Sequence, residues 1–191
     1  MSENYIEDQC FQEKDYSKKG LIAGVYQYCT FINCTFTNVD LSEIKFIECT
    51  FEDCDLSGAG LAKTAWQDVQ FRNCKLLGLH FDDCNHFLLA FNFDGCLLNF
   101  SSFNDLKLKR IQFKDCNLEE ADFTNTDLTS ATFDNCDLNR SIFDHTNLEK
   151  ADFRRATNYS IDPDLNRIKK AKFSVPGVLR ILNKYGIEIE Y

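Results

Sequence analysis

Large apolar residues recur every five positions along most of this 191-residue chain, and this period restricts what the chain can fold into. A first run comprises Phe31, Phe36, Leu41, Phe46, Phe51, Leu56, Leu61, Trp66, Phe71, Leu76 and Phe81. A second run comprises Leu98, Phe103, Leu108, Phe113, Leu118, Phe123, Leu128, Phe133, Leu138, Phe143, Leu148 and Phe153. A small or medium residue stands two positions before each centre, as Cys29 does before Phe31. Because five matches neither the helical period of 3.6 nor the strand period of 2, we predict short extended sides with two inward residues each, joined by corners.

A second period, of 20 residues, sorts these apolar residues by type. Members of one series 20 apart are Phe31, Phe51, Phe71 and Phe91, and later Phe113, Phe133 and Phe153. Four five-residue sides per coil would give this period, with like side chains stacked on neighbouring coils about 4.8 Å apart. We therefore predict an all-β fold, a quadrilateral parallel β-helix.

The two runs are out of phase by two residues, because Leu98 follows Phe91 by seven positions rather than five. We place a two-residue insertion at 92–97, where Gly95 gives the backbone freedom for the detour. The expected organisation is an N-terminal cap at 1–10, β-helix at 11–91, the insertion at 92–97, β-helix at 98–156, and a C-terminal cap and dimerisation module at 157–191.

The C-terminal segment changes character. Ser174 is placed to cap a short helix, Pro176 suits its first turn, and Gly186 suits its end. Residues 187–191 alternate apolar and polar, which predicts a terminal strand. Two interpretations stay open: a lid over the last coil, or a lid that also forms a two-fold dimer contact. The candidate dimer contact comprises Val178, Leu179, Leu182, Ile187, Ile189 and Tyr191.

Individual repeats resemble a known family. Ala-Asp-Phe-Thr-Asn at 121–125, Thr-Asp-Leu-Thr-Ser at 126–130 and Ala-Asp-Phe-Arg-Arg at 151–155 are similar to the A(D/N)LXX unit of pentapeptide-repeat proteins. The resemblance covers about residues 11–156. It implies a right-handed quadrilateral β-helix. From Phe11 to Phe153 we count about seven coils, or roughly 35 Å of axis at the strand spacing.

The helix-and-strand tail resembles the quinolone-resistance (Qnr-type) branch of that family. The resemblance implies that the C-terminal module joins two solenoids end to end. It also implies binding to bacterial type II topoisomerases, chiefly DNA gyrase, and their protection from quinolones. Many members of the branch carry long loops, whereas the insertion here has two residues. If protection depends on such loops, this chain binds a topoisomerase without protecting it, or does not bind.

The net charge of −9 is unevenly distributed. The side centred on Leu41, Leu61, Phe81, Phe103, Phe123 and Phe143 carries seven carboxylates against one basic residue, Lys63. This acidic side comprises Asp40, Glu43, Asp82, Asp83, Asp105, Asp122 and Asp144. An acidic body is not expected to bind nucleic acid directly, because phosphate contacts need Lys and Arg. It suits a protein partner with a basic DNA-binding surface, such as DNA gyrase or topoisomerase IV.

We therefore interpret the acidic side as an imitation of the phosphate face of duplex DNA. The alternative is that its carboxylates only keep a ladder-rich solenoid in solution. A further alternative function is a non-catalytic interaction scaffold with an unrelated partner. Its candidate contact patch comprises the nominally outward residues Leu77, Phe87, Leu88, Leu97 and Phe100. These residues either form an exposed patch or are tucked in by a local irregularity, where His86 occupies an inward centre.

The ten cysteines do not point to chemistry. Six of them, Cys34, Cys54, Cys74, Cys96, Cys116 and Cys136, fall in one ladder at small inward positions, where free Cys packs as a compact apolar residue. The three histidines form no nucleophile, base or metal arrangement, so we expect no enzyme, no cofactor and no metal. No apolar window of about 20 residues and no signal-peptide pattern is present, so we expect no membrane segment and a cytoplasmic location with reduced thiols.

Overall fold

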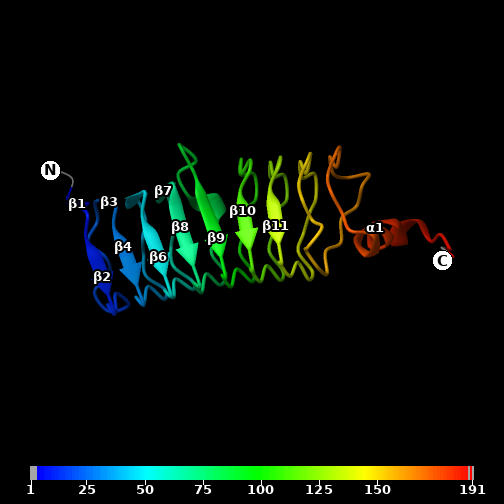
Figure 1. The fold of residues 1–191 in the computed structure, drawn as a ribbon. Coiled ribbons are helices and arrows are strands. Elements are labelled where there is room, and N and C mark those ends of the chain that lie inside the picture. The colour runs from blue at the N-terminus through cyan, green and yellow to red at the C-terminus, as the bar shows by residue number, and fades with distance from the viewer. Residues whose placement is uncertain (1–3, 189, 191) are drawn as a thin grey trace.

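The chain winds into a four-sided column whose coils stack along one axis, with the termini at opposite ends (Figure 1). The structure is a computed structural model, and it describes residues 4–188 and 190. Residues 20 apart lie side by side in parallel register, as Phe31 and Phe51 do. The period of 20 therefore corresponds to one coil, as the sequence predicts.

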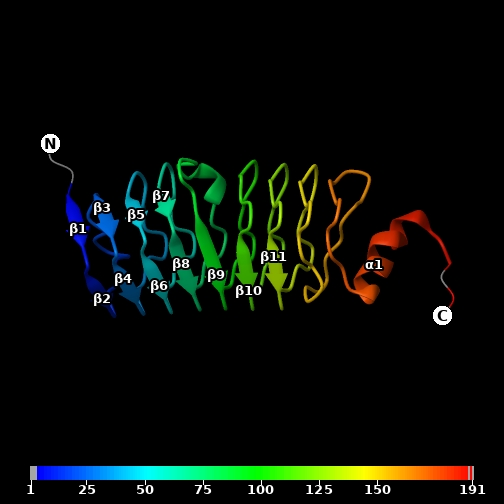
Figure 2. The ribbon, with the colours of Figure 1, turned by 45° about the horizontal axis from the view of Figure 1, so that its top comes forward.

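Two sides of the column are parallel sheets. The first side contains β1 (Tyr5–Glu7), β3 (Val25–Gln27), β5 (Lys45–Ile47) and β7 (Ala65–Gln67). The second side contains β2 (Cys10–Gln12), β4 (Thr30–Ile32), β6 (Thr50–Glu52), β8 (Val69–Arg72), β9 (Phe91–Asp94), β10 (Gln112–Lys114) and β11 (Thr132–Asp134). Figure 2 shows the two sets of arrows on neighbouring sides of the column.

The other two sides are held by isolated parallel bridges. On the third side the bridges run through Asp15, Thr35, Asp55, Lys75, Leu97, Asn117, Asp137 and Thr157. On the fourth side, which is the acidic side, Asp40 pairs with Gly60, and His80, Ser102, Asp122 and Ile142 form a ladder. A short 3-10 helix, η1 (Phe81–Asp83), also lies there.

The corners explain the polar residues of the repeat. The residue two positions after a centre adopts a left-handed backbone, as Asn33, Asp53 and Asn73 do with φ of 51° to 53°. Asn, Asp and Gly tolerate this conformation best. The Asp before a centre also accepts a hydrogen bond from a backbone N–H: Oδ1 of Asp122 lies 2.8 Å from the Thr124 nitrogen. Turn geometry thus favours Asn and Asp at these regularly spaced positions.

The interior is filled by stacked rings. One ladder runs Phe11, Phe31, Phe51, Phe71, Phe93, Phe113, Phe133, Phe153, Phe173, with neighbouring centroids 4.7 to 5.4 Å apart. A second ladder, Phe81, Phe103, Phe123, Phe143, meets the first edge to face. Such offset and T-shaped arrangements are the favourable ones for aromatic pairs.

The position of the insertion differs from our expectation of 92–97. Phe93, not Phe91, lies opposite Phe71, and Gly95 is an ordinary left-handed corner with φ of 67°. The regular register continues as far as Asn85, whose N–H bonds to the Thr64 carbonyl, and is restored at Ala90. The extra residues therefore lie in the 86–89 loop, which rises above the neighbouring coils beside β9 (Figure 1). Phe91 and Phe93 both fit the apolar pattern, and the spacing alone led us to choose Phe91.

Both ends of the β-helix also extend further than expected. Residues 5–10 do not form a cap, because β1 pairs with β3 as part of the first coil. At the other end, 157–173 continues the column beyond residue 156: Arg167 bridges Asn147, and Phe173 stacks on Phe153. The C-terminal module therefore begins near Ser174. These segments depart from the repeat consensus but still pair with the neighbouring coil, because the edge of that coil has N–H and C=O groups that need hydrogen-bonding partners.

The helix α1 (Val175–Leu182) follows the last coil and continues into the 3-10 helix η2 (Asn183–Tyr185). The expected cap is confirmed, since the Gly177 N–H donates to Oγ of Ser174 at 3.3 Å. A side chain on Gly177 would collide with the Tyr159 hydroxyl, so glycine permits the close docking. The expected terminal strand is not formed by Ile187, Glu188 or Glu190, and Ile189 and Tyr191 lie outside the described residues. After η2, residues 186–188 extend away from the last coil (Figure 1).

The cysteines pack in the interior as free thiols, with Cys10 alone exposed among them. Burial raises the pKa of Cys49 and of Cys84 to about 12. Because the thiolate is the reactive form, we expect Ellman's reagent at pH 8 to modify Cys10 rapidly and the other nine slowly. A denatured sample provides the full count of ten. Rapid modification of several thiols in the folded protein would contradict this packing.

Candidate protein-interaction site

The acidic side keeps its seven carboxylates at the surface of one side of the column. Asp40, Glu43, Asp83 and Asp105 are exposed, and Asp82, Asp122 and Asp144 are partly exposed. They lie on the turns that follow or precede the inward residues of the acidic side. The structure therefore places together, on one side, the residues that the sequence grouped.

Several of these carboxylates have local partners. Hydrogen bonding from the Ser42 side chain, and from the Ser42 N–H at 2.9 Å, holds the pKa of Asp40 below its usual range. The Lys63 ammonium lies 3.5 Å from Glu43, with both side chains largely in solvent. An exposed pair of this kind contributes little to stability.

Two histidines lie against acidic-side carboxylates. Nδ1 of His80 is 3.5 Å from Oδ1 of Asp82, and Nδ1 of His145 is 2.8 Å from Oδ1 of Asp144. Asp83 and Asp105 have no ion pair with any residue of the described chain. Asp40 and Asp122 also lack an ion pair within the described residues but accept hydrogen bonds within their own turns, so Asp83 and Asp105 are the carboxylates most available to a partner.

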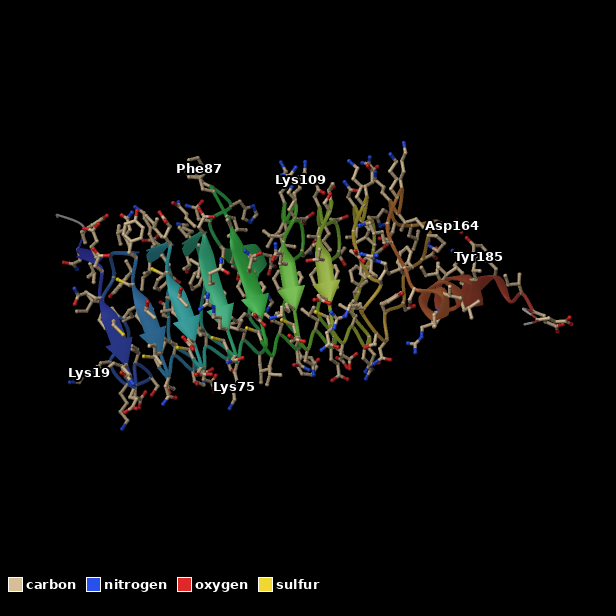
Figure 3. The ribbon with its side chains drawn as sticks, in the orientation of Figure 1. Lys19, Lys75, Phe87, Lys109, Asp164 and Tyr185 are labelled. Atoms are coloured by element: carbon tan, nitrogen blue, oxygen red, sulfur yellow. The ribbon has the colours of Figure 1, made fainter. Side chains whose placement is uncertain are left out.

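The sequence analysis ended the acidic side at Asp144, one coil before the acidic residues of this side end. Asp162 and Asp164 lie 20 residues after Ile142 and Asp144, so the same period contains them. Lys184 of η2 binds both, with Nζ 2.7 Å from Asp164 Oδ2, and the Tyr185 hydroxyl donates to Asp164 at 3.1 Å (Figure 3). The tail thus neutralises the C-terminal end of the acidic side.

The mid-column apolar residues do not form one patch. Phe87 and Leu88 are 69% and 63% exposed in the 86–89 loop on the first side. Leu97 and Phe100, also exposed, belong to the third side, where Leu97 bridges Lys75. Figure 3 shows Phe87 and Lys75 at opposite edges of the column.

Two further expectations at mid-column need correction. Leu77 is only partly exposed, and His86 is not an inward centre. The His86 ring is exposed, with Nε2 3.1 Å from the Asp82 carbonyl oxygen. The loop replaces one regular side of the coil, so nominal inward and outward positions lose their meaning within it.

The candidate dimer residues divide by their place on α1. Val178 is exposed, and Leu179 and Leu182 are partly buried. The helix packs on the last coil through Gly177 and Ile181, the latter a contact that the sequence analysis did not single out. Ile187 is exposed, whereas Ile189 and Tyr191 lie outside the described residues.

Comparison with known proteins agrees with this architecture. The model of the pentapeptide repeat region matches residues 26–92 and 88–160, together well over half of the chain. The chain belongs to the pentapeptide-repeat family. No curated protein sequence matches this pentapeptide-repeat protein.

Solved structures of other pentapeptide-repeat proteins are similar. Full-length QnrB1, a plasmid-mediated fluoroquinolone resistance protein, is 17% identical with a TM-score of 0.52, over 96% of this chain and 100% of QnrB1. A trypsin-treated QnrB1 variant is 18% identical with a TM-score of 0.52, over 98% and 92% of the two chains. HetL from the cyanobacterium Nostoc, described as involved in heterocyst differentiation regulation, is 16% identical with a TM-score of 0.30, over 89% and 87%. At these identities the QnrB1 structures support the fold alone.

Within the part of the chain that the structure describes, no cluster of three or more His, Cys, Asp or Glu side chains is arranged to hold a metal ion. In the same residues no helix has the length and apolar character needed to cross a bilayer.

Proposed function

We propose that this pentapeptide-repeat protein binds a bacterial type II topoisomerase, DNA gyrase or topoisomerase IV, and modulates its activity or its sensitivity to quinolones. In this proposal the acidic side occupies the basic surface that otherwise holds DNA. The observation that carries it is the gathering of seven carboxylates, opposed by Lys63, on one side of a regular column.

The charge density suits that role. From the coil of Asp40 to the coil of Asp144 there are five steps, or roughly 24 Å at about 4.8 Å per step. Seven carboxylates over that length give about one charge per 3.4 to 4 Å. Each strand of duplex DNA carries one phosphate per about 3.4 Å of axis. The acidic side can therefore present a DNA-like row of charges to cationic residues.

The mechanism needs no catalysis. The column interior is filled by stacked side chains, and the proposed action is competition for a surface. The fold is shared with QnrB1, whose description as a fluoroquinolone resistance protein is consistent with this partner class. A topoisomerase-binding protein acts in the cytoplasm, where its free thiols stay reduced.

A supercoiling assay with purified DNA gyrase tests the proposal directly. We expect inhibition that increases with the concentration of this protein and is relieved by added DNA, because both compete for one surface. A parallel titration with a quinolone measures protection. Rescue from the drug would extend the likeness to quinolone-resistance proteins, whereas absence of any effect at tens of micromolar, on gyrase and on topoisomerase IV, would refute the proposal.

An interaction scaffold with an unrelated protein partner is the second candidate. It is favoured by the exposure of Phe87 and Leu88 on a loop that projects from the column. Replacing both with Asp should leave gyrase inhibition intact if the acidic side is the contact surface. Loss of inhibition in that variant would assign the contact to the loop instead.

We further propose that two chains associate end to end through the C-terminal module. The exposed Val178 and Ile187 would then be covered by the second copy, since Gly177 and Ile181 already face the last coil. Light scattering after size exclusion should give twice the 22.1 kDa mass of one chain. The Val178→Glu variant should elute as a monomer, and Leu165→Glu, an exposed residue of the last coil, serves as the matched control. A wild-type monomer at 100 micromolar would exclude this dimer.

A further inference from the structure

The 86–89 loop leaves a gap in the hydrogen bonding of the first side. In later coils the residue that begins this side donates its N–H to the preceding coil: Asp127 to the Leu106 carbonyl at 2.8 Å, and Asn147 to the Thr126 carbonyl at 2.9 Å. Lys107 holds the same place, since it bridges Asp127. Its N–H has no acceptor among the described residues, beside the point where the preceding coil departs into the loop.

A second N–H in the same turn is also left without an acceptor. In the next two coils the side chain that begins the turn caps it: Asp127 Oδ1 accepts from the Thr129 N–H at 3.1 Å, and Asn147 Oδ1 from the Glu149 N–H at 3.2 Å. The corresponding residue before Lys109 is Lys107, and a lysine side chain has no acceptor atom. The Lys109 N–H therefore finds none among the described residues.

These donors border a cavity of about 150 Å³ between the loop and the following coil. Its lining comprises Leu89, Ala90, Phe91, Asn92 and 107–111. Lys107 and Lys109 both line this cavity. Three cationic side chains, from Lys107, Lys109 and Arg110, belong to the same turn. No carboxylate residue lines the cavity. Of these three cations, only Lys109 has an ion pair among the described residues, with Nζ 3.4 Å from Asp127 Oδ2.

We propose that this break is a binding site for a phosphate group. Two main-chain N–H groups without acceptors, set beside three cations, match the acceptors and the charge of a phosphate oxyanion. The site belongs to the first side and does not depend on the function proposed for the acidic side. It also departs from the sequence expectation of no contact with nucleic acid, because the cations gather locally although the body is acidic.

The phosphate has two possible sources, a small molecule or a nucleic-acid backbone. The same side carries Lys150, Lys169 and Lys170 in later coils, all exposed and without an ion pair among the described residues. They lie two and three coil steps from the turn, or roughly 10 to 15 Å. A phosphodiester chain could contact the turn of Lys107 and these later lysines at the same time, whereas inorganic phosphate would contact the turn alone. Figure 3 shows Lys109 on the same edge of the column as Phe87.

Nuclear magnetic resonance with inorganic phosphate, against chloride at equal ionic strength, tests the site in the whole protein. We expect saturable shifts of the Lys107 and Lys109 amide resonances. The variants Lys107→Gln and Lys107→Asn both remove one charge, but only Asn can cap the Lys109 N–H as Asn147 caps Glu149. Phosphate affinity should therefore fall at least threefold further in Lys107→Asn than in Lys107→Gln. Equal loss in the two variants, or no shift of either amide in 20 mM phosphate or in the presence of duplex DNA, overturns the proposal.

Binding of a labelled 20-base-pair duplex at 50 and 200 mM salt separates the two sources. A nucleic-acid ligand should bind more weakly at higher salt and lose affinity in both Lys107→Asn and Lys150→Gln. A small-molecule ligand should be insensitive to Lys150→Gln and leave the duplex unbound. Duplex binding that Lys150→Gln weakens and Lys107→Asn leaves unchanged would place the phosphate contact elsewhere on this side and refute the site.

Discussion

Replacing Phe113 with Ala is expected to lower the free energy of unfolding by about 4 kcal/mol, in the range measured for fully buried aromatic residues. The Phe113 ring is inaccessible to solvent and stacks between Phe93 and Phe133, with centroid distances of 5.3 and 5.1 Å. It also meets Phe103 and Phe123 edge to face. The substitution thus opens a cavity where both aromatic ladders meet, and the rigid ladder cannot collapse to fill it.

Urea unfolding followed by two signals measures this effect. Trp66 is the single tryptophan and is buried on the N-terminal side of Phe113, so its fluorescence reports one part of the column, whereas circular dichroism reports all of it. Coils contact mainly their neighbours, so the variant should also separate the two transitions. Phe87→Ala, at an exposed loop position, is the control and should change stability by less than about 0.5 kcal/mol. Similar losses in both variants would contradict the assigned core.

Reversing three charges of the acidic side is expected to weaken binding to DNA gyrase at least a hundredfold. The variant Asp82→Lys/Asp83→Lys/Asp105→Lys replaces attraction by repulsion at the centre of the row, and it includes the exposed Asp83 and Asp105. Lys63 and Arg110 show that basic side chains fit corners of this column, so the fold should be retained. The loss should appear as a higher concentration for half-inhibition of supercoiling and as a slower association rate.

A matched variant separates surface position from net charge. Glu48→Lys/Asp53→Lys/Asp68→Lys changes the net charge by the same amount, at exposed corners outside the acidic side. We expect it to keep most of the inhibition. If both triple variants lose inhibition equally, total charge acts rather than a DNA-like row, and the mimicry proposal fails.

The sequence by itself determined the column, its period of 20 and most of its core. A repeating chain makes every coil equivalent to its neighbours, so one inward assignment, such as Phe31 on Phe51, fixes the rest. The same equivalence placed the cysteine ladder in the interior and the carboxylates Asp40 to Asp144 on one side. These features follow from the spacing of residues along the chain, because each coil packs on the next in the same way.

Only the tertiary structure decided what happens where that equivalence ends. Phe91 and Phe93 fit the pattern equally well, and the choice of Phe93 came from pairing along β8, which moved the insertion into the 86–89 loop. Beside the same loop the Lys107 amide has no acceptor among the described residues, and Phe87 lies on the side opposite Leu97. At the C-terminus, Gly177 and Ile181 form the buried face of α1, and Gly177 packs against Tyr159. The 20-residue period predicts which residues are neighbours only where the repeat is unbroken. At an insertion or at an end of the column, the path of the chain depends on hydrogen bonds and packing with residues distant in the sequence.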